Sequence, residues 1–161
     1  MNFGYETKGL STWGTTPWFG CRFQAPGSGN ITSITAYLYM EFGGANVNFG
    51  LYNDNAGDVG THVAHGVAES LASGYDNWKT INVSGPIIGG NYYWLVCQLD
   101  EANQTYYHDS GVENQHAEIF FWTFDDWSDN PPIDGWDPWK VSIYATYTPA
   151  ANPRSRGYIF G

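Results

Sequence analysis

Basic residues are scarce in this sequence. Its 161 residues include six Lys and Arg against 16 Asp and Glu, which gives a formal net charge of −10. Nucleic-acid binding relies on clustered Lys and Arg that neutralise phosphates, so this composition argues against a nucleic-acid partner. An anionic membrane surface is disfavoured for the same reason. No apolar run approaches the ~20 residues of a membrane-spanning helix, so we expect no membrane insertion.

Cysteine is also rare, with Cys21 and Cys97 each in a strand-like segment. The two could form a disulfide, as in extracellular proteins, or remain two buried thiols. The sequence leaves both alternatives open because it does not fix the Cα separation that a bridge requires. No signal peptide is visible after Met1, so a leader was either removed or never present.

Long runs of Ala, Glu, Lys and Leu are missing, whereas aromatic residues make up 18% of the chain and glycines number 20. Apolar residues alternate with period two, as in Ile34-Thr35-Ala36-Tyr37-Leu38 and Val141-Ser142-Ile143-Tyr144-Ala145. This pattern predicts half-buried strands rather than helices. The continuous apolar run at 92–97 predicts a central strand covered on both faces.

The turn-rich segments between these runs complete the expected fold, an all-β, antiparallel two-sheet jelly-roll sandwich of about nine strands over residues 1–148. We expect strands near residues 3–7, 18–24, 31–40, 46–53, 61–69, 77–83, 91–100, 105–110 and 140–148, with a weaker one near 117–122. The expected core includes Ile34, Leu38, Phe49, Leu51, Trp94 and Ile143.

Several segments carry a family resemblance, and they occur in a familiar order: 3–5, 21–29, 31–38, 50–55, 60–61, 90–96, 106–111 and 142–147. Together they resemble a jelly-roll domain that recurs in secreted, surface and phage proteins and is similar in architecture to carbohydrate-binding modules. The resemblance covers nearly all of residues 3–148 and implies a fold rather than a chemistry. It implies a location outside the cell, at the cell surface or on a virion.

Catalytic machinery is not evident. There is no Gly-x-Ser-x-Gly nucleophile elbow. The candidate carboxylate pairs all lie in one Pro-rich loop, whereas a glycosidase places its pair across a cleft. We therefore predict no catalytic residue and a protein that is not an enzyme.

Calcium is the one cofactor that the sequence suggests. Five carboxylates crowd into residues 125–137 and would repel one another without a cation or a neighbouring arginine: Asp125, Asp126, Asp129, Asp134 and Asp137. A second loop with Asp54, Asn55 and Asp58 is better explained by turn formation.

His62 and His65 could form half of a zinc site, but residues three apart on a regular strand point to opposite faces, so a structural role is favoured.

Aromatic side chains offer a platform for sugars. The candidates are Trp127, Trp136 and Trp139 in the acidic loop, which we expect at residues 121–139, and Tyr37, Tyr39 and Tyr144 on the outward faces of strands. The alternative is that the loop tryptophans plug one end of the sandwich and the tyrosines pair across strands.

Three N-glycosylation sequons begin at Asn30, Asn82 and Asn103, and they matter only if the protein is secreted through a glycosylating pathway.

Residues 149–161 form a tail of different character. Residues 1–148 contain four Lys and Arg against all 16 acids, whereas the tail contains two arginines and no acid. The tail is predicted to dock on a neighbouring copy through its two arginines and three large apolar residues: Arg154, Arg156, Tyr158, Ile159 and Phe160. We therefore expect a non-catalytic structural subunit of an extracellular or virion-associated fibre, which polymerises head-to-tail. The alternative is a carbohydrate-binding module with glycans as its partner.

Overall fold

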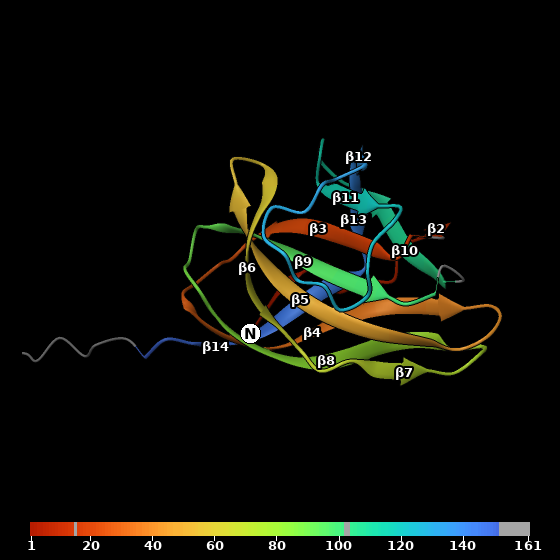
Figure 1. Cartoon of the computed structure of the whole chain (residues 1–161). Coiled ribbons are helices and arrows are strands. Elements are labelled where there is room, and N and C mark those ends of the chain that lie inside the picture. The colour runs from red at the N-terminus through yellow and green to blue at the C-terminus, as the bar shows by residue number, and fades with distance from the viewer. Residues whose placement is uncertain (15, 102–103, 152–161) are drawn as a thin grey trace, which may run out of the picture.

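The structure is a computed structural model that describes residues 1–14, 16–101 and 104–151. These residues form fourteen strands and, over that part of the chain, no helix. The strands pack as two antiparallel sheets (Figure 1). The predicted all-β, antiparallel two-sheet sandwich is thus confirmed. The predictions for Asn103 and for Arg154, Arg156, Tyr158, Ile159 and Phe160 lie outside the described residues.

The strands follow one another along the whole described chain. They are β1 (Asn2–Gly4), β2 (Ser11–Gly14), β3 (Trp18–Gln24), β4 (Gly29–Met40), β5 (Ala45–Asn55), β6 (Asp58–His65), β7 (Glu69–Leu71), β8 (Asp76–Ile87), β9 (Tyr92–Leu99), β10 (Gln104–Ser110), β11 (His116–Ile119), β12 (Gly135–Asp137), β13 (Trp139–Val141) and β14 (Ile143–Pro149).

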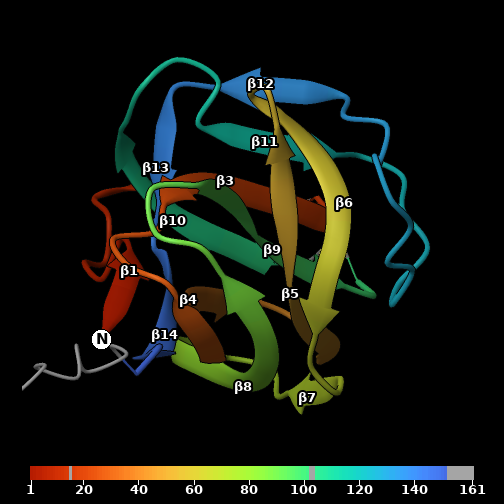
Figure 2. The ribbon, with the colours of Figure 1, turned by 90° about the vertical axis from the view of Figure 1, so that its left-hand side faces the viewer.

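Eight of these strands form the centre of the sandwich. Sheet A contains the order β2-β10-β4-β8, and sheet B contains the order β3-β9-β5-β6. This is the connectivity of a jelly roll, in which successive strands alternate between the two sheets except for β5 and β6, which form a hairpin in sheet B. The strands β1, β13 and β14 extend sheet A, and β7, β11 and β12 extend sheet B. Figure 2 shows the two layers from the side.

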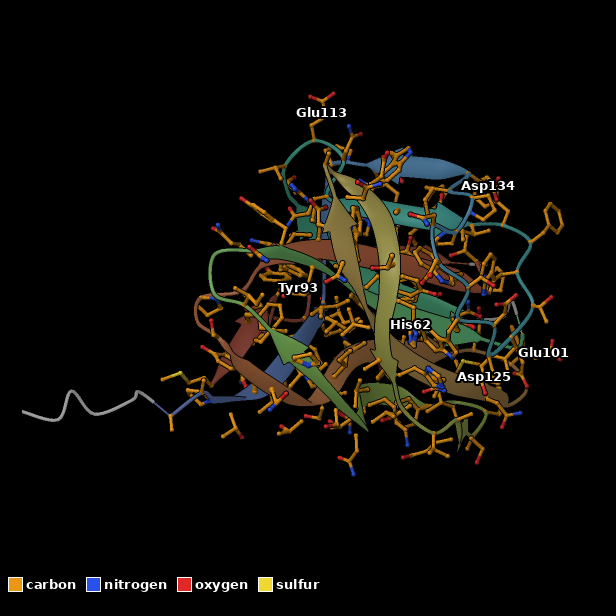
Figure 3. The ribbon with its side chains drawn as sticks, turned by 60° about the vertical axis from the view of Figure 1, so that its left-hand side comes forward. His62, Tyr93, Glu101, Glu113, Asp125 and Asp134 are labelled. Atoms are coloured by element: carbon orange, nitrogen blue, oxygen red, sulfur yellow. The ribbon has the colours of Figure 1, made fainter. Side chains whose placement is uncertain are left out.

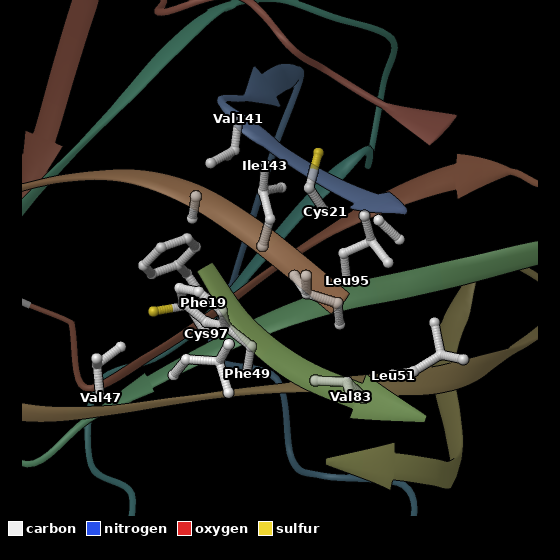
Figure 4. Packing of buried hydrophobic residues seen from close by; sticks show 14 of the residues in the cluster. Phe19, Cys21, Val47, Phe49, Leu51, Val83, Leu95, Cys97, Val141 and Ile143 are labelled. Atoms are coloured by element: carbon white, nitrogen blue, oxygen red, sulfur yellow. The ribbon is translucent and has the colours of Figure 1, made fainter. Parts of the chain in front are cut away.

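The core between the sheets follows from the period-two alternation. Residues Ile81, Val83, Gly85 and Ile87 of β8 are buried, whereas Asn82, Ser84 and Pro86 between them are exposed. Five of the six residues predicted for the core lie in this main cluster, and each is fully buried: Ile34, Leu38, Phe49, Leu51 and Ile143. Figure 4 shows part of this packing.

The sixth predicted core residue, Trp94, is fully buried in a second hydrophobic cluster, on the outer side of sheet B. Residues 120–134 cross this side and place Trp122, Trp127 and Ile133 against it. Gly50 on β5 makes room for the loop, because a Cβ there would come within 2.2 Å of the Trp127 ring. The loop explains why β9 is buried on both faces, as its continuous apolar run predicts.

The number of strands exceeds the predicted nine because two predicted strands are divided, the weaker strand near 117–122 is present as β11, and β2 and β12 lie outside the predicted segments. The segment near 61–69 becomes β6 and β7, which pair with different parts of β5. The segment near 140–148 becomes β13 and β14 at Ser142, whose N–H donates to Tyr107 O and whose carbonyl accepts from Tyr37 N, both at 2.9 Å. At Ser142 the chain therefore changes its partner from β10 to β4.

Candidate binding surfaces

An aromatic face occupies the outer side of sheet A. It consists of Tyr37 on β4, Trp78 on β8, Tyr107 on β10 and Tyr144 on β14, all half-buried. The Tyr37 ring lies edge-on to Trp78 at 5.3 Å and to Tyr107 at 5.1 Å, and Trp78 lies edge-on to Tyr144 at 5.6 Å. Tyr37 and Trp78 face each other across β4 and β8. Four strands that are distant in sequence thus bring four rings together on one surface.

Two charged side chains border this aromatic face. The Lys8 ammonium lies 4.4 Å from the centre of the Tyr37 ring and 4.3 Å from that of Tyr107. The Tyr37 hydroxyl donates to Asp76 Oδ1 at 2.9 Å. Burial and this hydrogen bond raise the pKa of Tyr37, so its hydroxyl stays protonated. The face therefore combines accessible rings with a cation and a carboxylate, which are the groups that hold polyhydroxylated ligands.

The structure separates the six predicted glycan-binding aromatics. Tyr37 and Tyr144 lie in the aromatic face, and Tyr39, two residues along β4, points to the same side of the sheet. The three tryptophans lie elsewhere. Trp139 stacks on His108 at 4.2 Å, Trp136 lies edge-on to Trp94 at 5.6 Å, and Trp127 stacks on His65 at 5.0 Å.

Two members of the aromatic face, Trp78 and Tyr107, were missed from the sequence. Their signal was present, because both alternate with inward residues: Trp78 precedes the buried Ile81 and Val83 at odd spacing, and Tyr107 lies between the buried Tyr106 and His108. The parity of each strand placed them outward, but only the pairing of β4 with β8 and β10 brings them beside Tyr37.

The five carboxylates of the acidic loop each have a different protein partner. Asp125 Oδ1 accepts from Asn48 Nδ2 at 2.8 Å and Trp127 Nε1 at 2.7 Å. Asp126 accepts from Ser128 N at 3.0 Å, and Asp129 accepts from His62 N at 2.7 Å. Asp134 accepts from Phe120 N at 2.9 Å, and Asp137 accepts from His116 Nδ1 at 3.3 Å. Within the described ranges, no three His, Cys, Asp or Glu side chains form a metal-binding group. Each carboxylate is thus held by hydrogen bonds within the loop or to strands of sheet B, and calcium binding stays a prediction.

The second acidic loop is held by an ion pair. Arg22 Nε and Nη2 donate to Asp54 Oδ1 and Oδ2 at 2.6 and 2.8 Å, and Gly57 N donates to Oδ2 at 3.1 Å. Burial opposes ionisation of Asp54, but these hydrogen bonds outweigh it and lower the pKa of the carboxyl. The turn-forming role expected for this loop agrees with these contacts.

Two open depressions of about 300 and 290 Å³ lie near this ion pair. Trp136 and Asp58 line both of them. The residues that line them include Arg22, Asn55, Asp58, Glu113, Asn114 and Asn130. Trp136, one of the predicted tryptophans, thus lines both depressions.

His62 and His65 lie on the same side of β6, so the expectation that they point to opposite faces is wrong. Leu51 pairs with Ala64 and Tyr52 pairs with His62, which leaves Val63 as an extra residue in a β-bulge. The bulge shifts the alternation by one. As a result His62 Nε2 and His65 Nδ1 lie 3.1 Å apart.

Cys21 and Cys97 are free and fully buried, so the disulfide alternative is not realised in this structure (Figure 4). Burial raises the pKa of Cys21 to about 12 and that of Cys97 well above its ordinary value.

Two of the sequon asparagines, Asn30 and Asn82, are exposed on β4 and β8.

Comparisons with known proteins support the fold. No family model and no curated protein match the chain. Among solved structures, it is similar to the clostridial cysteine protease Cwp84 after propeptide cleavage, with a TM-score of 0.57 and 12% sequence identity. The match covers 90% of this chain and 39% of that chain, so the domain spans less than half of the solved protein's length. At this identity the likeness shows a shared sandwich fold.

This likeness corrects the prediction that the chain is not an enzyme. The solved chain that contains the same fold is a cysteine protease. A sandwich of this kind therefore occurs within an enzyme, and neither the fold nor the missing nucleophile motif excludes enzyme activity.

The described residues contain no helix long and apolar enough to cross a membrane.

Proposed function

We propose that this domain binds carbohydrate through the aromatic face of sheet A. The observation that supports the proposal is the gathering of Tyr37, Trp78, Tyr107 and Tyr144 on an outer sheet face. The CH faces of a sugar ring are apolar and pack against aromatic rings, and the hydroxyls at its rim need polar partners. Lys8, which lies over the Tyr37 and Tyr107 rings, supplies a donor, and Asp76 supplies an acceptor beside Tyr37.

Three further points bear on the proposal. The loop of residues 120–134 covers the outer side of sheet B, whereas the four rings on the outer side of sheet A stay half-exposed. The Lys8 ammonium lies over the Tyr37 and Tyr107 rings, so a sugar that stacks on these two rings would have to displace it. The resemblance to carbohydrate-binding modules agrees with a binding role outside the cell, at the cell surface or on a virion.

Affinity electrophoresis in gels that contain a soluble polysaccharide tests the proposal. Xylan, hydroxyethyl cellulose, laminarin and glycol chitin would be tried in turn, and we expect at least one to retard the protein. The change Trp78→Ala removes the largest ring of the face, so it is expected to weaken binding by at least about tenfold.

The matched control is Trp13→Ala. Trp13 is 45% exposed, but it packs on Trp139 at 5.3 Å and donates its Nε1 to Glu118, away from the aromatic face. This variant should keep the retardation of the wild type. Equal retardation of wild type and Trp78→Ala would place any glycan site elsewhere, and no retardation in any of the four gels would remove the proposal.

We also propose that the domain polymerises into an extracellular or virion-associated fibre through its C-terminal residues. One structural observation favours this. The strand β8 is twelve residues long, pairs with β4 along one side, and has no strand on its other side among the described residues. Such an edge can accept a strand from a neighbour. Residues 1–148 carry a net charge of 4 − 16 = −12 and the tail +2, so the two are also electrostatically complementary.

Deletion of residues 152–161 tests the fibre proposal and leaves β14, which ends at Pro149, intact. The full chain should sediment as a polymer at micromolar concentration, and the truncated chain should sediment near its monomer mass of about 17 kDa, against 17.9 kDa for one full chain. If both sediment alike, whether as monomers or as polymers, the tail does not drive assembly.

A further inference from the structure

A pair of histidines on the outer side of sheet B has a geometry that the expected strand pattern does not provide. The bulge at Val63 turns His62 and His65 to the same side, and the nitrogens His62 Nε2 and His65 Nδ1 lie 3.1 Å apart. Figure 3 labels His62 on β6 and Asp125 on the loop beside it. The His62 side chain is half-buried and His65 is exposed, so solvent reaches the pair.

The 3.1 Å separation is close to that of two ligands on one metal ion. Zinc–imidazole bonds are about 2.0–2.1 Å long, so two nitrogens on a tetrahedral zinc ion lie ~3.3 Å apart. Two nitrogens at adjacent corners of a square-planar copper site lie slightly closer together. To bind one ion, both rings would have to turn so that both lone pairs point at it in place of the present hydrogen bond.

The surroundings hold both rings in place. The His65 ring is parallel to Trp127, with an interplanar angle of 2° and a centroid separation of 5.0 Å. The His62 ring lies 5.4 Å from Tyr52 and 5.7 Å from Trp127. Rings fixed in this way lose little freedom when they bind an ion, which favours binding.

Charge around the pair also favours a cation. Asp129 accepts the backbone N–H of His62 at 2.7 Å, and Asp125 accepts the Trp127 Nε1–H at 2.7 Å. These carboxylates come from the acidic loop and have no lysine or arginine partner in the described part of the chain. Because no third His, Cys, Asp or Glu joins the pair among the described residues, water would complete the coordination shell.

We propose that His62 and His65 form a two-histidine site for a divalent transition-metal ion that prefers imidazole, with Cu²⁺ bound more tightly than Zn²⁺. The order follows from the general affinity series of these ions for nitrogen ligands. The site lies on the opposite sheet from the proposed carbohydrate face, so the two proposals are independent of each other.

Titration of the protein with Cu²⁺, buffered by glycine and followed by electron paramagnetic resonance, tests the site. The wild type should bind one Cu²⁺ with two imidazole nitrogens in its spectrum. His62→Gln and His65→Gln should each weaken binding by at least tenfold and leave one imidazole nitrogen. Equal affinity in the double variant would overturn the proposal, as would a wild-type spectrum without two imidazoles.

A measurement on the wild type alone covers the case in which the variants fold poorly. With diamagnetic Zn²⁺, long-range proton–nitrogen NMR spectra should show His62 Nε2 and His65 Nδ1 as the metal-bound nitrogens. The protons should then lie on His62 Nδ1 and His65 Nε2, because each bound nitrogen uses its lone pair. If the spectra show that either histidine keeps a proton on the nitrogen that faces the other, the pair is a hydrogen bond and not a metal site.

Discussion

Replacing Trp94 by alanine is expected to lower the free energy of unfolding by about 3–5 kcal/mol, the range for removing a large aromatic side chain from a core. Trp94 is fully buried at the centre of the second cluster and packs edge-on to Trp136 at 5.6 Å. Its Nε1 donates to Asp54 Oδ1 and to Asp58 O, both at 3.1 Å. The change therefore opens a cavity and also removes a donor from the carboxylate that pairs with Arg22.

Equilibrium unfolding in urea measures this loss, and Trp78→Ala is the matched control. Both changes remove an indole from a strand, but Trp78 lies half-exposed on the outer face of sheet A. Its loss should cost about 1 kcal/mol or less. Comparable losses in the two variants would show that the loop of residues 120–134 does not bury Trp94 as the structure describes.

The fold could be predicted because the period-two alternation is regular where strands pair without interruption. The strand β8 alternates without a break from Ile81 to Ile87, and β9 reads as apolar on both faces. The boundaries that were missed depend on partners rather than on residue type. Nothing in Lys140-Val141-Ser142-Ile143 indicates that Ser142 is the point where one strand changes its neighbour from β10 to β4.

The candidate sites were predictable only in part, for the same reason. The outward parity of Tyr37 and Tyr144 follows from local alternation, whereas their meeting through Trp78 requires the register of β4 with both neighbours. The geometry of His62 and His65 was predicted wrongly, because a single bulge at Val63 reverses parity and leaves no sequence signal. Carboxylates such as Asp125 and Asp129 indicated a cation. In the structure they accept hydrogen bonds from two donors of sheet B, the Asn48 side chain and the His62 backbone N–H.

Acidification from pH 6.5 toward pH 4.5 is expected to destabilise the domain through His116. This side chain is fully buried, with Nε2 at 2.9 Å from the Tyr106 hydroxyl and Nδ1 at 3.3 Å from Asp137 Oδ2. Burial lowers the pKa of His116 to about 3, so the ring stays neutral in the fold and its contact with Asp137 is a hydrogen bond. In the unfolded chain the pKa of a histidine is about 6.5.

Below pH 6.5 the unfolded chain therefore binds one more proton than the folded chain, and the free energy of unfolding falls as the pH falls. The slope is about 1.4 kcal/mol per pH unit, or about 2.7 kcal/mol at pH 4.5. Burial lowers the pKa of His62 and His108 as well, which adds to this loss. Burial raises the pKa of Glu118 and Asp137, which opposes the loss near the acid end of the range.

The change His116→Gln separates the contribution of His116 from these neighbours, because glutamine retains a polar group near Tyr106 but does not titrate. The variant should be less stable than the wild type at pH 7, since its amide fits the imidazole contacts imperfectly. Between pH 6.5 and pH 4.5 its urea-unfolding free energy should fall by about 2.3 kcal/mol less than that of the wild type if His116 stays neutral throughout, because the unfolded histidine is already half protonated at pH 6.5. Parallel pH profiles for the two proteins would mean that His116 takes up its proton within the fold, with Asp137 as the counter-charge, and that burial does not control this site.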